Sequence, residues 1–280
     1  MDIKKRLLTT LLLLGYGIIL FAQSLTTTRF EEHAFSLGGG VTNLLDTYLS
    51  PLTYRGGHIS LLDERFTQTN AKSRRWFTQS LFFLHGDYTL TAGKRALTVG
   101  GIADYSYTYY YRPPFNNMRW NFYVGPQGQL RVGGIYNLRN SNNPAQLKLG
   151  VNIAASAIGK YSFMLWRTPM NMRLQADIPL LGFAFGPDYG QSYYEIFYLG
   201  HTEDCVHITA PHNNLSLRTK FSYDVTFRSC TMRLTWQEDL YHWQLRNQHY
   251  RMFTHSVMIG LVRNLYNVLR DDEARKFIPY

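Results

Sequence analysis

The sequence predicts an all-β protein, a transmembrane antiparallel β-barrel of about 10–12 strands that follows a cleaved N-terminal signal peptide. Three observations predict it. The chain begins with an export signal, its later segments alternate apolar and polar residues with a period of two, and its composition is rich in tyrosine but poor in charge.

The first 22 residues have the layout of a secretory signal. Lys4, Lys5 and Arg6 form a basic start, an apolar run covers residues 7–21, and Ala22 precedes a polar stretch. The apolar run of about 15 residues is shorter than the roughly 20 that a membrane-spanning helix needs. We therefore expect residues 1–22 to be removed after Sec export. Residues 23–280 would then form the barrel domain, with a short C-terminal tail at about 268–280.

The composition after the signal favours a membrane barrel. Removing three basic residues and one acid from the 29 and 19 of the whole chain leaves 26 and 18, a net charge of +8. Aromatic residues make up 15% of the chain, with 21 Tyr, and charged residues only 17%, against about 25% in soluble domains. No later segment is a second apolar span, so the expected location is the outer membrane of a Gram-negative bacterium. A secreted, tyrosine-rich β-sandwich is the alternative.

The alternation identifies strands and assigns their faces. It is clear in residues 97–111, 129–139, 146–156, 171–180, 215–228 and 232–237. A period of two indicates a strand, and about ten such residues cross an outer membrane when tilted. The faces predicted to meet lipid include Leu147, Leu149, Val151, Ile153, Leu217, Phe221 and Val225. The predicted aromatic girdle is Tyr105, Tyr107, Tyr109, Tyr111, Trp120 and Trp236.

The opposite faces carry charges that would point into the lumen. They are Arg131, Lys148, Arg173, Arg218, Lys220, Arg233, Asp104, Asp177 and Asp224. Charges in a narrow barrel generally pair with each other, because an unpaired buried charge is costly. Such pairs would plug the lumen. The excess of basic residues leaves a narrow anion-favouring channel as the functional alternative.

Turn residues separate the predicted strands. Pro51 and residues 112–114, 140–144, 186–190 and 211–214 are expected in turns or loops, and the last strand is placed near residues 255–264. The chain has two cysteines, Cys205 and Cys230. They could form a disulfide only if both lie at the same end of the barrel, which the sequence leaves open.

Residues 38–56, GGGVTNLLDTYLSPLTYRG, carry the one motif that resembles a known family. Its characteristic positions are Asn43, Asp46, Tyr48, Ser50, Pro51 and Tyr54. It resembles the N-terminal signature of a family of uncharacterised Bacteroidota proteins, a domain of unknown function of the DUF3316 type. The resemblance implies an exported outer-membrane barrel and carries no activity or catalytic residues.

The same motif has a physical interpretation as a hairpin turn. Asp46 can bond the backbone two residues on, and Pro51 restricts the backbone of the turn. Tyr48 and Tyr54 would anchor the turn at the membrane interface. The functional alternative is a periplasmic docking site for a partner.

Enzyme candidates are weak. A lipid hydrolase would use His212 and Ser216 with Asn213 or Asn214, but residues four apart on a strand lie about 13 Å apart. His201, Glu203, Asp204 and His207 could serve a metal or a protease.

No metal, cofactor or nucleic-acid motif is present, so no cofactor is expected. The leading hypothesis is a non-enzymatic barrel, either a scaffold or accessory subunit of an envelope complex or a narrow anion-favouring channel. The alternative is an outer-membrane lipid hydrolase or protease. Outer-membrane lipid and an envelope protein are the expected partners, and the oligomeric state is left open.

Overall fold

A computed structural model describes residues 30–70, 73–94, 96–114, 119–140, 143–166, 168–187, 190–202, 205–227 and 230–266. The predicted signal peptide, residues 1–22, and the predicted tail, about 268–280, lie outside these ranges.

The described residues form eleven strands and one short helix. In chain order these are β1 Phe30–Asp46, β2 Ser50–Asn70, β3 Ser73–Thr91, β4 Leu97–Tyr111, β5 Trp120–Asn137, β6 Ala145–Leu165, β7 Thr168–Phe185, α2 Tyr193–Phe197, β8 Val206–Thr209, β9 Leu217–Thr226, β10 Thr231–Leu245 and β11 Gln248–Tyr266. No helix among the described residues is long and apolar enough to span a membrane.

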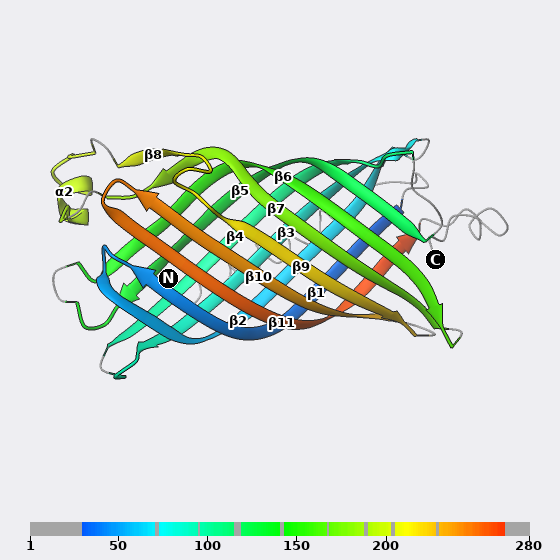
Figure 1. Ribbon diagram of the computed structural model, residues 1–280, viewed down its shortest axis with the longest axis horizontal. Helices are drawn as coiled ribbons and strands as arrows, with labels where there is room; N and C mark the ends of the chain where they lie inside the picture. Colours follow the sequence, from blue (N-terminus) through cyan, green and yellow to red (C-terminus); the bar gives the residue numbers. More distant parts are fainter. Residues whose placement is uncertain are drawn as a thin grey trace, which may run out of the picture.

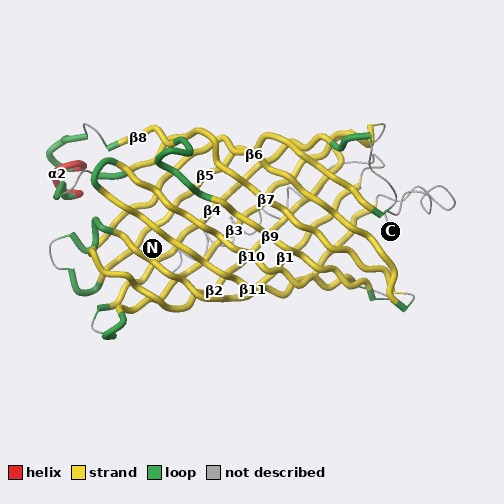
Figure 2. Tube along the Cα trace, viewed as in Figure 1, coloured by secondary structure: helices red, strands yellow, loops and turns green. Residues whose placement is uncertain are grey.

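The strands close into one antiparallel wall, as Figures 1 and 2 show. Neighbours follow the order β6-β5-β4-β3-β2-β1-β11-β10-β9-β7, and β6 also pairs with β7. The short β8 pairs with the end of β7 beyond the part that β9 covers, so β8 and β9 share one position in the wall. The barrel therefore has ten strand positions, which confirms the predicted fold class.

The two ends of the barrel differ. At one end Phe30 pairs with Tyr266, so β1 begins and β11 ends there, at the right in Figure 1. We call this the termini end. The long connection between β7 and β9, which holds α2 and β8, lies at the opposite end, on the left. We call that end the mouth.

Glycines in β1 allow the wall to close tightly. A Cβ at Gly40 would lie 1.7 Å from the carbonyl oxygen of His255 on β11, and one at Gly38 would lie 2.0 Å from that of Val257. No side chain fits at those distances. The glycine run therefore lets β1 approach β11 at the point where the barrel closes.

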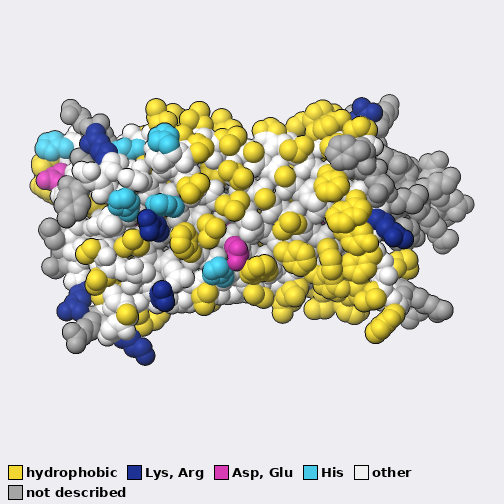
Figure 3. Space-filling view, in the orientation of Figure 1, with side chains coloured by type: hydrophobic (Ala, Val, Ile, Leu, Met, Phe, Trp, Pro, Cys, Tyr) yellow, Lys and Arg dark blue, Asp and Glu magenta, His cyan; other side chains and the backbone are white. Residues whose placement is uncertain are grey.

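The alternation in sequence becomes an apolar outer face and a polar inner face. Val151 is 56% exposed on the outside, while its neighbour Asn152 is 7% exposed and faces inward. The other predicted lipid-facing residues are exposed or half-buried on the same outer surface. Figure 3 shows hydrophobic side chains over the length of the wall. Hydrocarbon can cover such a surface, whereas the closed ladder satisfies the backbone.

One strand is apolar on both faces, and the interior explains why. On β3, Leu81 and Phe83 point inward and form a cluster with Leu62 of β2 and Met258 of β11. The lumen therefore contains an apolar layer. This is why residues 76–91 do not alternate cleanly.

Two sequence expectations need correction. Pro51 lies within β2 rather than in a turn; it is the second residue of that strand, next to a register shift at Asp46. The predicted girdle is also too broad. Tyr105, Tyr107, Tyr109 and Tyr111 follow one another along β4, so they span about 20 Å instead of one membrane level.

The aromatic side chains of a real girdle gather nearer the termini end. Trp76 stacks on Tyr109 with ring centroids 5.2 Å apart, and Trp120 contacts Tyr161 at 4.6 Å. These rings come from four successive strands, β3 to β6. They form a belt of the kind that lies at a membrane–water boundary.

Candidate functional site: the charged lumen

All nine charges that the sequence assigns to the lumen lie inside the barrel. Their side chains are buried, and each belongs to the inner face of its strand. The structure adds further lumen charges that the alternation in the sequence does not assign. These are Glu32, Asp46, Glu64, Asp87, Lys160 and Asp239. Most of these charges divide into three groups along the barrel axis. Of the other two, Asp177 accepts hydrogen bonds from Ser156 and Gln175, and Asp87 belongs to a histidine network described below.

Arg233 organises the group nearest the termini end. Its Nη2 donates to Glu32 Oε1 at 2.6 Å, and its Nη1 donates to Glu64 Oε2 at 3.1 Å. Its Nε and Nη2 also form a fork with the carboxylate of Asp224, at 2.7 and 2.8 Å. One guanidinium thus links β10 to β9 and, past the closing seam, to β1 and β2.

Three more cations complete this termini-side cluster. Lys160 lies 3.1 Å from Glu32, Lys220 pairs with Glu64, and Arg173 approaches both carboxylates at 3.7 and 3.9 Å. Lys160, Arg173 and Lys220 come from β6, β7 and β9, so the pairs reach across the lumen from wall to wall. Two carboxylates on β1 and β2 are thereby held by cations from the opposite side of the barrel.

A central cluster lies further towards the mouth. Arg131 forms a fork with Asp104, at 2.7 and 2.9 Å, and Arg218 joins it through Nη2 at 2.8 Å. Arg218 also pairs with Asp239. The guanidinium of Arg131 stacks on the ring of Tyr241 at 3.3 Å. Aromatic faces therefore support the cations where carboxylates do not surround them.

The predicted turn motif contributes the third group. Lys148 Nζ lies 2.7 Å from Asp46 Oδ2 and 3.7 Å from the ring centroid of Tyr250. The other oxygen of Asp46 accepts from the backbone N of Tyr48 at 3.2 Å, as predicted for the turn. Asp46 therefore closes the β1–β2 hairpin and also holds a lumen lysine.

The remaining motif residues correct part of the turn hypothesis. Tyr48, in the turn between β1 and β2, and Tyr54, on the inner face of β2, are buried inside the barrel mouth rather than placed at a lipid interface. Tyr54 accepts a hydrogen bond from Asn137 at 3.0 Å. Ser50 accepts from the N–H of Leu52, and Asn43 is half-buried on the outer face.

Two histidines form a separate hydrogen-bonded network. His58 contacts Ser256 Oγ at 2.8 Å and Thr42 Oγ1 at 2.9 Å. Thr42 donates to Asp87, whose other oxygen lies 2.7 Å from His85 Nδ1. A hydroxyl beside an imidazole is also a catalytic arrangement. Here every member is buried in the lumen, so a substrate could reach Ser256 only if the lumen opened.

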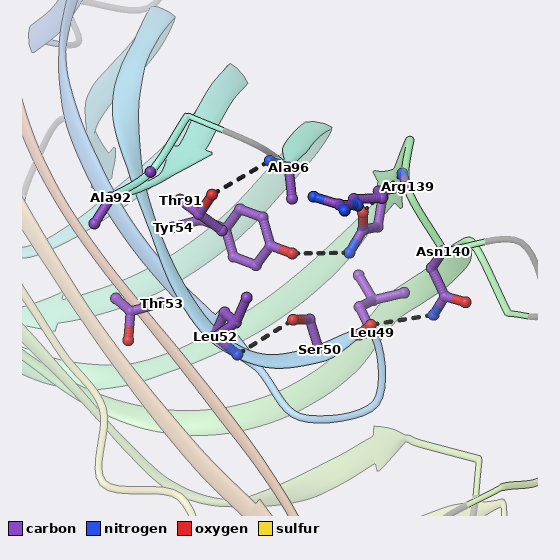
Figure 4. A pocket seen from close by; sticks show the side chains of 12 residues that line it. Leu49, Ser50, Leu52, Thr53, Tyr54, Thr91, Ala92, Ala96, Arg139 and Asn140 are labelled. Atoms are coloured by element: carbon purple, nitrogen blue, oxygen red, sulfur yellow. Dashed lines mark hydrogen bonds between the residues drawn. The ribbon is translucent and has the colours of Figure 1, made fainter.

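A hollow of about 720 Å³ opens at the mouth (Figure 4). The tips of the β1–β2, β3–β4 and β5–β6 hairpins line it. Figure 4 shows the ring of Tyr54 within the hollow, with Arg139 and Asn140 on the far side. The side chain of Asn140 donates to the carbonyl of Leu49 at 3.1 Å, which ties two of the hairpins together. The hollow is thus held in shape by hydrogen bonds between its walls.

The connection that carries α2 is fixed to the mouth. Ser192 and Glu195 form a capping box, and Ile196 is buried beneath the helix. Tyr193 accepts a hydrogen bond from the N–H of Leu147 at 2.7 Å and lies edge-on to Tyr48. Burial raises the pKa of Tyr193 to about 12. On the other side of α2, Tyr194 and Tyr198 stack on each other and are exposed.

The structure does not assemble the predicted enzyme sites. Ser216 faces inward and donates to Asn214 at 2.5 Å, while His212 is exposed in the preceding turn. His207 contacts the carbonyl of Gly186. Glu203 and Asp204 lie outside the described residues, and within those residues no group of three potential ligands is placed to hold a metal.

The two cysteines do not form a disulfide. Cys205 is buried near the mouth, whereas Cys230 is exposed in the β9–β10 turn at the termini end. The condition for a disulfide, that both lie at one end, is therefore not met.

A closed antiparallel wall with an apolar outside and a polar inside defines a transmembrane β-barrel of the outer-membrane type. The chain belongs to the family described as "Protein of unknown function (DUF3316)", whose profile matches residues 6–271. The resemblance found in the hairpin motif is thus confirmed. No curated protein matches the chain.

Several solved barrels are similar at low identity. The translocator domain of the autotransporter NalP from Neisseria meningitidis is 8% identical, with 92% of this chain and 97% of that chain covered and a TM-score of 0.41. The COG4313 outer membrane channel from Pseudomonas putida F1 is 10% identical, with 86% and 97% covered and a TM-score of 0.34. Ail of Yersinia pestis is 8% identical, with 83% and 99% covered and a TM-score of 0.31.

Proposed function

We propose that this protein is a non-conducting, non-enzymatic barrel of the outer membrane of a Gram-negative bacterium, reached by Sec export, and that it serves as a scaffold or accessory subunit of an envelope complex. The observation that carries the proposal is the pairing of the lumen charges. Each of the seven lumen cations lies within ion-pair distance of a carboxylate. Ions in transit would have to displace these pairs.

The charge balance argues against the anion-favouring channel. The sequence assigns six cations and three carboxylates to the lumen, whereas the described lumen holds seven cations and eight carboxylates. The expected basic excess is absent once the inner faces of β1, β2, β3 and β10 are included. The fixed charges of the described lumen then give no preference for anions over cations.

The mouth end supports the scaffold role. Outer-membrane barrels present short turns to the periplasm and longer loops to the outside. By that rule the α2 connection faces outward, and so does the β1–β2 turn, which moves the hypothetical docking site of this turn away from the periplasm. The exposed rings of Tyr194, Phe197 and Tyr198 give this end an aromatic surface that a partner could cover.

Planar-bilayer recording of the purified protein tests the closed lumen. We expect no steady current from the wild type. A steady current whose ion selectivity changes in Arg233→Glu would show that ions pass the termini-side cluster, and the scaffold proposal would then give way to a channel.

Assays for lipase and protease activity on the same preparation test the alternative hypothesis, that the protein is a lipid hydrolase or a protease. We expect no turnover. Turnover lost in Ser256→Ala but retained in Ser216→Ala would assign an enzyme to the histidine network and refute the proposal.

A further inference from the structure

Among the described residues, Asp, Glu, Arg and His side chains on the outer face of the strands occur on one side of the barrel only. Four adjacent strands, β10, β11, β1 and β2, bear eleven such side chains on their outer face: Glu31, His33, Arg55, Asp63, Arg65, Glu238, His242, His249, Arg251, His255 and Arg263. On the described outer faces of β3 to β9, no Asp, Glu, Lys, Arg or His side chain is present. We call the four-strand surface the charged sector. Figure 3 views this side, where acidic and histidine side chains interrupt the hydrophobic surface.

Six of these side chains form three cross-strand pairs. His33 Nε2 lies 2.5 Å from Asp63 Oδ1, Arg65 Nε lies 3.2 Å from Glu31 Oε1, and His255 Nδ1 lies 2.9 Å from Glu238 Oε1. The pairs are not shielded by neighbouring side chains, since about two-fifths of Asp63 and His255 remain exposed.

The pair of His255 and Glu238 lies within the apolar surface rather than above it. Glu238 follows the exposed Trp236 on the same face of β10, and His255 is flanked on β11 by Phe253 and Val257, both exposed. Lipid chains offer such groups no hydrogen bonds. Ionisable side chains at membrane depth are accordingly rare and generally mark a functional or protein-covered surface.

The apolar surface around Ile59 has one protruding side chain and two recessed positions beside it. Ile59 on β2 is 77% exposed. Its register partners on the two neighbouring strands are Gly39 on β1 and Gly86 on β3, so no side chain stands beside it on either side. The result is a single protruding side chain next to two shallow hollows.

We infer that the charged sector is a contact surface for a second copy of this chain. The sector carries acids and bases side by side, so a two-fold axis through it brings acids of one copy towards bases of the other. The same axis lets Ile59 of each copy enter a glycine hollow of its partner.

Site-specific crosslinking in lipid vesicles tests this contact. Ile259 on β11 and Ile153 on β6 are both 60% exposed, the first inside the charged sector and the second outside it. Each is changed to cysteine in a Cys205→Ser, Cys230→Ser background, and the purified, reconstituted protein is treated with a short bis-maleimide. We expect covalent dimers from Ile259→Cys in several-fold excess over Ile153→Cys. Equal yields, or dimers from neither variant, would overturn the proposal.

A second variant asks whether the polar pairs hold the contact. The double change His33→Leu, Asp63→Leu should reduce the dimer yield of Ile259→Cys, while Thr219→Leu on the outer face of β9 should not. Heat-dependent gel migration checks that each variant remains a folded barrel. Undiminished dimer yield in the folded leucine pair would show that the charges play no part. The contact is independent of the proposed function, because a conducting barrel could equally form it.

Discussion

Arg233 offers the sharpest test of how the lumen is held together. Its guanidinium makes four charge-assisted hydrogen bonds to three buried carboxylates. Replacing it by methionine keeps much of the side-chain volume and removes the charge. We expect Arg233→Met to fold less stably, because it leaves carboxylates buried without their cation.

The magnitude follows from what remains after the change. Glu32 keeps Lys160 and Glu64 keeps Lys220, so neither becomes isolated. Asp224 has Arg233 as its ion-pair partner among the described residues and loses both bonds of the fork. Breaking a buried pair on one side costs about 3–5 kcal/mol. We therefore expect the free energy of unfolding to fall by about that amount.

The double variant Arg233→Met, Asp224→Leu distinguishes the stability lost with the ion pair itself from the cost of leaving the Asp224 carboxylate buried without a partner. Removing both partners should recover about 2–3 kcal/mol relative to the single variant, since no orphaned carboxylate remains. Urea unfolding in lipid vesicles, followed by tryptophan fluorescence, measures both values. A double variant as unstable as the single one, or a single variant that loses under about 1 kcal/mol, would refute the view that paired charges stabilise the lumen.

Three further predictions concern the wall and the mouth. Val151→Arg places a charge on the lipid face and should lower the free energy of unfolding by about 2–4 kcal/mol; the same urea assay measures it, and a wild-type value would mean that the faces are inverted. Gly40→Ala should abolish heat-dependent gel migration or cost about 1–3 kcal/mol, because its Cβ meets the carbonyl of His255, whereas Gly57→Ala, with 3.4 Å to its nearest atom, should fold normally. Tyr193→Phe removes the acceptor for a backbone N–H and should speed protease cleavage of the α2 connection without changing barrel stability; equal cleavage rates would show that this bond does not fasten the loop.

Much of the fold could be predicted from local pattern. In β6, strict alternation from Leu147 to Ser156 assigns both faces correctly, since one face meets lipid and the other meets the lumen. A slip of one residue would reverse every side chain in the strand, so the pattern and the register specify each other.

The lumen partners could not be predicted in the same way. Glu32 and Glu64 lie in β1 and β2, where the glycine run and inward-facing Leu62 blur the alternation. Which acid meets which base is decided by the tilt of the strands around the closed wall, which places Arg233 of β10 beside Glu64 of β2. A strand-by-strand pattern contains no such information. Two signals were available. Continuing the period past Gln237 on β10 places Asp239 inside, and continuing it past Ser156 on β6 places Lys160 inside.

The pairing of β1 with β11 sets a condition on how this protein can reach its membrane. Residues 30 and 266 are register partners, so the ring cannot be completed until almost the whole described chain has been delivered. Until then both terminal strands are open edges, whose peptide groups hydrocarbon cannot satisfy. Insertion into the membrane and closure of the barrel must therefore proceed together. A chain that has lost its last strand would remain an open, aggregation-prone sheet that is not inserted in the bilayer.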